Sequence, residues 1–83
     1  MKRLYFDARE LEHPKPMEEA LKLIQGMDEQ SYLYMIHRKH PVPLLELVAI
    51  RGFQTLVYED EEKDWHILIT KSQNISLVEF LDV

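Results

Sequence analysis

The chain contains no cysteine among its 83 residues. This absence excludes disulfide bonds, thiolate metal sites, cysteine nucleophiles and persulfide chemistry. Glycine is also scarce, with only Gly26 and Gly52, and we expect each of them to mark the end of a helix. A chain of this length is expected to form one small domain with a modest hydrophobic core.

Long apolar runs are absent as well, and none approaches the roughly 20 residues that a membrane-spanning helix needs. The basic N-terminus, residues 1–7, has an apolar run too short for a signal peptide, so a cytoplasmic location is expected. The formal net charge is −5. Because phosphate neutralisation dominates affinity for nucleic acids, this charge disfavours nucleic acids and anionic membranes as partners.

Hydrophobic periodicity predicts the element order β-α-β-α-β-β. Leu4 and Phe6 alternate with polar residues, as in a strand, whereas Met17, Ala20 and Ile24 recur at helical spacing. Strand–helix–strand units make right-handed crossovers between parallel strands, so both helices should cover one face of the sheet in an α+β two-layer sandwich. The predicted strands are residues 2–7, 31–37, 53–59 and 65–71, and the predicted helices begin at Pro16 and Pro43.

Two similar segments connect predicted strands to predicted helices. They are His13-Pro14-Lys15-Pro16-Met17 and His40-Pro41-Val42-Pro43-Leu44. Proline suits the first turn of a helix, and we expect the second proline of each segment to be the first helical residue. The first backbone N–H groups of a helix have no partner within it, so each of these corners is expected to offer an anion-binding position.

The two corners should lie side by side, because parallel neighbouring strands end at the same edge of a sheet, where open α/β sheets usually bind ligands. Many of the basic residues and histidines fall on this edge, whereas Glu10, Glu12, Glu18 and Glu19 would offset part of their charge. Solvated surface charge is the alternative interpretation. The candidate ligand-binding residues are Arg9, His13, Lys15, Arg38, Lys39 and His40.

The segment Leu11-Glu12-His13-Pro14-Lys15-Pro16-Met17 resembles the Cys-Pro-x-Pro segment of the TusA/SirA-like sulfur carriers. The resemblance implies a four-stranded mixed sheet of order 1-2-4-3 with strand four antiparallel to the others. The chain is more similar to a branch of that superfamily that is a domain of unknown function, through Pro41-Val42-Pro43-Leu44, Gly52-Phe53 and Trp65. His13 takes the position of the persulfide-bearing cysteine, so sulfur transfer is not expected.

Three functional hypotheses follow from the edge residues. The leading one is a non-catalytic binding or regulatory module for a small anionic ligand or the acidic segment of a protein partner. The alternative is metal binding by His13, His37 and His40, because neutral imidazoles bind zinc and copper well. An enzyme with a histidine general base is the third, but the sequence shows no nucleophile–base–orienter set, and it identifies no cofactor.

Residues 72–83 follow the predicted sandwich of residues 1–71 and are too apolar to remain free. Ser76 and Glu79 fit a capping box, which predicts a short helix. This tail is expected to pack on its own domain or on a partner, so both monomer and homodimer stay open. His66 is predicted to face solvent. The sheet face opposite the helices should carry Tyr5, Tyr32, Tyr34, Ile36 and Leu68.

Overall fold

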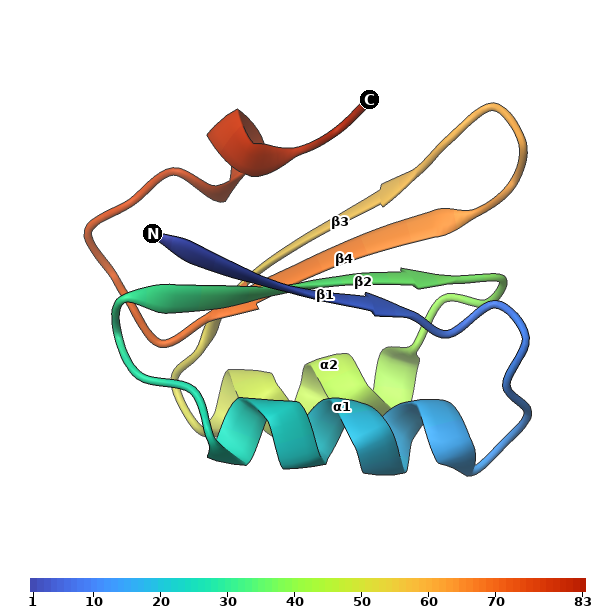
Figure 1. Cartoon of the computed structure of the whole chain (residues 1–83), viewed down its shortest axis with the longest axis horizontal. Coiled ribbons are helices and arrows are strands. Elements are labelled where there is room, and N and C mark those ends of the chain that lie inside the picture. Colours follow the sequence, from blue (N-terminus) through green and yellow to red (C-terminus); the bar gives the residue numbers. More distant parts are fainter.

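The computed structural model describes residues 1–83 and confirms the predicted element order (Figure 1). Two helices lie against one face of a four-stranded sheet, and the C-terminal segment lies against the other face. No helix is both long and apolar enough to cross a membrane. In chain order the elements are β1 (Lys2–Asp7), α1 (Lys15–Gln25), β2 (Ser31–His37), α2 (Val42–Ile50), β3 (Gln54–Glu59), β4 (Trp65–Thr70) and the 3-10 turn η1 (Leu77–Phe80).

The strand order is β1-β2-β4-β3, with β1 parallel to β2 and β4 antiparallel to both of its neighbours. The register pairs Leu4 with Leu33 and Tyr34 with Leu68. In this topology β1 and β2 end at the same edge of the sheet, and the β3–β4 hairpin turns there too (Figure 1). Three loops that are distant in sequence therefore meet at one edge.

The main core lies between the sheet and the two helices. Alternate residues of β2 and β4, such as Leu33 and Ile69, are fully buried there against Ile24 of α1 and Val48 of α2. A period of two in the strands and of 3.6 in the helices brings these side chains to one interface. The alternation predicted for β1 is confirmed, because Leu4 and Phe6 pack against this same core.

The opposite face of the sheet forms a second, smaller core under the tail. Leu77 is only 3% exposed and packs with Tyr32, Tyr34 and Leu68. The expected short helix is instead the four-residue 3-10 turn η1. Ser76 makes no side-chain cap; its carbonyl accepts the N–H of the residue three positions later at 3.2 Å, so the predicted capping box is wrong.

The two glycines both follow helix ends, as predicted, but in different conformations. Gly26 directly follows α1 with ordinary right-handed geometry, at φ −88° and ψ −3°. Gly52 lies beyond α2 with φ +82°, in the left-handed region that only glycine enters without strain. The chain can therefore reverse from α2 into β3 within a few residues.

Candidate functional site

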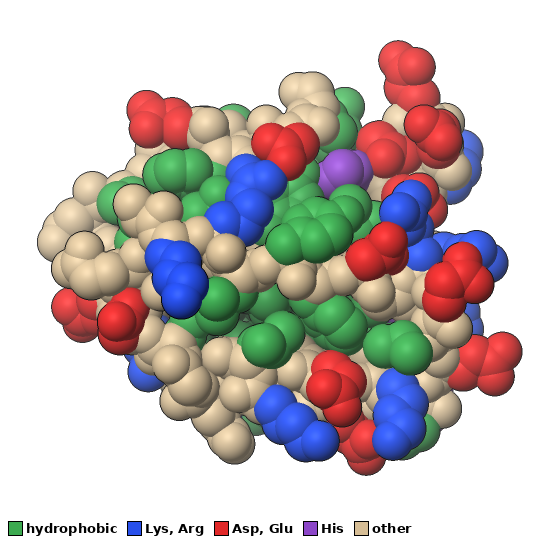
Figure 2. Space-filling view, in the orientation of Figure 1, with side chains coloured by type: hydrophobic (Ala, Val, Ile, Leu, Met, Phe, Trp, Pro, Cys, Tyr) green, Lys and Arg blue, Asp and Glu red, His purple; other side chains and the backbone are tan.

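The two His-Pro-x-Pro corners border one groove, with a volume of about 750 Å³, at the edge where β1 and β2 end. Figure 2 shows acidic and basic side chains mixed at this edge, on the right of the view. The predicted juxtaposition of the corners is therefore present. The groove is lined by Arg9, Glu10, Leu11, Glu12, His13, Pro16, Met17, Met35, His37, Arg38, Lys39, His40, Pro41, Pro43 and Leu44.

Each helix begins one residue earlier than predicted. The first helical residues are Lys15 and Val42, so Pro16 and Pro43 occupy the second position of their helices. Proline is equally acceptable there, because the first-turn N–H groups have no intrahelical partner. The prolines of both corners are thus in equivalent places, although only the His13–Pro14 peptide bond is cis.

The corners leave fewer free backbone donors than the sequence suggests. The N–H of the first helical residue donates to a preceding loop carbonyl at 2.9 Å in both corners, and the prolines have no N–H. The N–H groups of Glu18 and Leu45 close the first helical turns at 3.1 Å. Among the N–H groups of the first helical turns, only those of Met17 and Leu44 lack a hydrogen-bond partner, and both residues line the groove.

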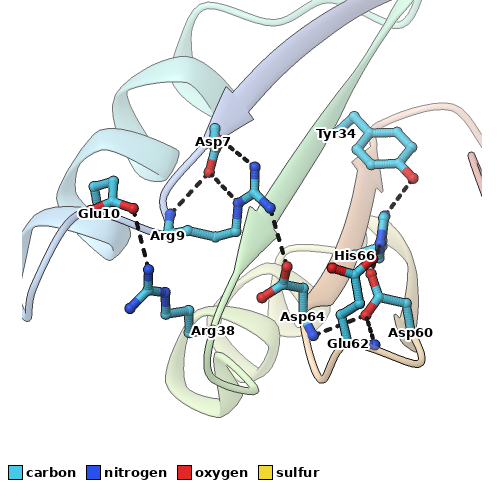
Figure 3. Close-up of polar contacts among 9 residues, drawn as sticks. All are labelled: Asp7, Arg9, Glu10, Tyr34, Arg38, Asp60, Glu62, Asp64 and His66. Atoms are coloured by element: carbon cyan, nitrogen blue, oxygen red, sulfur yellow. Dashed lines mark hydrogen bonds and ion pairs between the residues drawn. The ribbon is translucent and has the colours of Figure 1, made fainter.

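Arg9 is held by carboxylates on two sides (Figure 3). Its guanidinium lies 2.7 Å from the Asp7 carboxylate and 3.1 Å from that of Asp64. These contacts stabilise the ionised carboxylate, so the hydrogen bonds from Arg9 lower the pKa of Asp7 to about 2. Arg9 therefore ties the end of β1 to the β3–β4 turn and forms a fixed wall of the groove.

The other basic candidates differ in their freedom. Arg38 pairs with Glu10 at 3.2 Å, and the two side chains are 64% and 87% exposed (Figure 3). Lys15 lies 4.0 Å from Glu18 and does not line the groove. Lys39 lines the groove and makes no ion pair. Of the three lysine and arginine side chains that line the groove, Lys39 is thus the only one that pairs with no carboxylate.

Three histidines line the groove, and they are not gathered with other side chains as a set of metal ligands. No group of three or more histidine, aspartate or glutamate side chains is arranged to hold a metal ion. The ring of His40 stacks on Trp65, with 4.5 Å between centroids and 9° between planes. His37 has a buried Nδ1 without a hydrogen-bond partner, and burial, followed by the charge of Lys39, lowers its pKa. His37 is therefore neutral at pH 7.

The structure thus brings together five of the six candidate ligand-binding residues, Arg9, His13, Arg38, Lys39 and His40, and leaves Lys15 outside. Sequence reasoning missed the carboxylates of Asp7 and Asp64, which neutralise Arg9. The position of Asp64 directly before β4 could have predicted this contact. Because β4 is antiparallel to β2, it starts at the edge of the sheet where β2 ends.

A second polar cluster joins Tyr34 of β2, His66 of β4 and Asp60 of the β3–β4 turn (Figure 3). His66 is only 6% exposed, so the prediction that it faces solvent is wrong. Its Nδ1 lies 2.7 Å from the Tyr34 hydroxyl, and its Nε2 lies 2.9 Å from Asp60. Burial raises the pKa of Tyr34, while the contact with His66 lowers the pKa of Asp60. The Tyr34 hydroxyl also accepts the N–H of Asp82 at 3.0 Å, so the cluster is a satisfied network that contacts the tail.

Comparison with known proteins identifies the family and nothing finer. Neither a curated protein nor a solved structure matches the chain. A family model described as "Uncharacterized conserved protein (DUF2249)" matches residues 5–71. These residues contain both corners, the groove they border and nearly all of the sheet. The chain therefore belongs to the DUF2249 family of uncharacterized conserved proteins.

Proposed function

We propose that this domain is a non-catalytic binding module that holds a small anionic ligand in the groove between its two corners. The groove volume of about 750 Å³ falls within the roughly 300–1,000 Å³ typical of small-molecule sites. The proposal rests on the first turns of α1 and α2, which border the same groove. Each of these turns has one unpaired N–H group, that of Met17 in α1 and that of Leu44 in α2. Such groups bind carboxylate and phosphate oxygens readily.

Lys39 supplies the charge for this ligand. It makes no ion pair, whereas Arg9 is occupied by two carboxylates. The Arg38–Glu10 pair is largely exposed, and exposed pairs of this kind contribute only about 0–1 kcal/mol. Arg38 can therefore leave Glu10 and turn to an incoming anion at little cost. Glu10 and Glu12, which also line the groove, favour a small and localised anion over an extended one.

The groove residues support binding rather than catalysis. They include no serine, threonine, tyrosine or cysteine, so the side chains that most often serve as nucleophiles are missing from the groove. His37 is neutral and partly buried, and it lines the groove although its Nδ1 is closed off from solvent. We assign it a role in shaping the wall of the groove.

We further propose that the domain is a cysteine-less relative of the TusA/SirA-like sulfur carriers. The strand order β1-β2-β4-β3 is the order that this resemblance implies. His13, which occupies the place of the persulfide cysteine, lines the groove. Imidazole cannot carry a persulfide, so the relationship extends to the fold and the position of the site, and sulfur transfer is excluded from the proposal.

The experiment is an anion titration followed by the fluorescence of Trp65, the single tryptophan of the chain, which contacts the groove through His40. Phosphate, sulfate, simple carboxylates and nucleotides are compared. Lys39→Gln should weaken binding of the best anion about tenfold, because a charge-assisted hydrogen bond contributes about 1.5 kcal/mol. Lys15→Gln, outside the groove, is the matched control and should leave the affinity unchanged. Equal losses in the two variants would contradict the proposed site.

A further inference from the structure

The sheet face opposite the helices is apolar, and its cover comes from outside the family domain. The cover, Ile75–Val83, lies beyond the residues that the family model matches, 5–71. The face itself lies within them. In this chain, the apolar surface of the matched residues is therefore buried by a segment outside the match. The side chains of this face are Tyr32, Tyr34, Ile36, Leu56 and Leu68.

Side chains of the sheet recognise the cover. The Arg3 guanidinium donates to the carbonyl of Phe80 at 2.7 Å and pairs with the carboxylate of Asp82. The Phe80 ring lies on Tyr32, with 4.7 Å between ring centroids, and the N–H of Asp82 donates to Tyr34 at 3.0 Å. No backbone–backbone hydrogen bond joins the cover to a strand. The sheet therefore binds both backbone groups and side chains of a short segment, as peptide-binding sites do.

The cover is anchored at few points. Leu77 is its only buried side chain, whereas Val78 is 60% exposed and Val83 is 61% exposed. The Arg3 and Asp82 side chains are 30% and 59% exposed, and exposed ion pairs add little to stability. The regular structure of the cover is a single 3-10 turn of four residues. A competing segment with the same side chains can therefore displace it.

We propose that this face is a binding site for a segment of a partner protein, and that the cover occupies it as an intramolecular competitor. The cover defines the chemistry of the partner segment: a leucine, a phenylalanine three positions later, and an aspartate two positions after that. Two hydrogen bonds fix the linker between β4 and the cover: Gln54 donates to the carbonyl of Ser72 at 3.1 Å, and Gln73 donates to that of Gly52 at 2.9 Å. A fixed linker disfavours the exchange of covers between two copies of the chain. The proposal does not depend on the groove, which lies at a different part of the molecule.

The test uses the full chain with Val83→Cys, a position that is exposed and the only cysteine in the variant, carrying a fluorine label. A peptide of residues 75–83 is added, and a peptide with Phe80→Ala and Asp82→Asn is the matched control. The native peptide should release the label and shift the amide signals of Tyr32 and Tyr34. Half-release is expected near millimolar peptide, because a short tether gives the cover an effective concentration on that order.

A second chain variant makes the result decisive. Asp82→Asn in the chain weakens only the tethered cover, so the native peptide should half-release it at a concentration roughly twofold to fivefold lower. A peptide concentration of 10 mM is about an order of magnitude above the expected midpoint. The absence of release at that concentration would overturn the proposal, and so would equal release by the control peptide. Light scattering follows the same samples. A dimer that the native peptide dissolves would identify the occupant as the cover of a second copy and would overturn the partner assignment.

Discussion

Leu77→Ala is the most informative change in the tail. Leu77 is 3% exposed against Tyr32, Tyr34 and Leu68, and the substitution removes three carbon atoms from this contact. At about 0.8 kcal/mol per methylene-sized group, the lost transfer free energy is about 2 kcal/mol. The cavity term should be small, because the tail is free to settle onto the sheet, so the value lies at the low end of the usual range for leucine to alanine.

The assay is urea or thermal unfolding of the full chain. A loss of about 2 kcal/mol corresponds to a fall of roughly 8–16 °C in Tm for a domain of this size. Val78→Ala is the matched control: it lies in the same 3-10 turn but is 60% exposed, and it should change the free energy of unfolding by less than about 0.5 kcal/mol. If both variants changed stability equally little, the tail would not be docked as described and the reasoning would be refuted.

Three further predictions concern other parts of the chain. The pKa of Asp7 is lowered from 3.8 to about 2, so its stabilising contribution is complete above about pH 4 and is lost as the pH falls toward 2; Asp7→Asn should flatten the stability–pH curve in that interval, as urea unfolding would record. Gly52→Ala, at φ +82°, should destabilise by about 1–2 kcal/mol, whereas Gly26→Ala, at φ −88°, should be neutral or slightly stabilising in the same assay. His66→Leu removes a partner of the buried Tyr34 hydroxyl and should destabilise by about 1–3 kcal/mol; adding Tyr34→Phe should recover part of the loss, and additive losses would count against the network.

The local signals of the sequence were sufficient for the element order because they agreed with one another, whereas the strand order β1-β2-β4-β3 was expected from the family resemblance. Alternation in β1, helical spacing in α1 and the short β3–β4 turn permit few topologies once right-handed crossovers are required. The meeting of the corners followed from the parallel pairing of β1 and β2. The helix starts were misplaced by one residue, because proline fits the second position of a helix as well as the first.

The polar partners could not be predicted, because they depend on contacts between distant segments. Arg9 and Asp64 are separated by 55 positions, and Arg3 and Asp82 by 79. The prediction that His66 faces solvent was wrong because nothing in the alternation of β4 revealed that Tyr34, Tyr58 and Asp60 would surround it. The packing of other side chains around a strand residue is a tertiary property that strand periodicity does not encode.

The central claim is that two helix starts form one binding site, and amide chemical shifts test it most directly. A titration of labelled protein with the anion that binds best should move the signals of Met17 and Leu44, the two unpaired donors, along curves with the same dissociation constant. Lys39 and His40, which line the groove between them, should follow that curve as well. Movement at only one corner, or different midpoints at the two corners, would contradict a shared site.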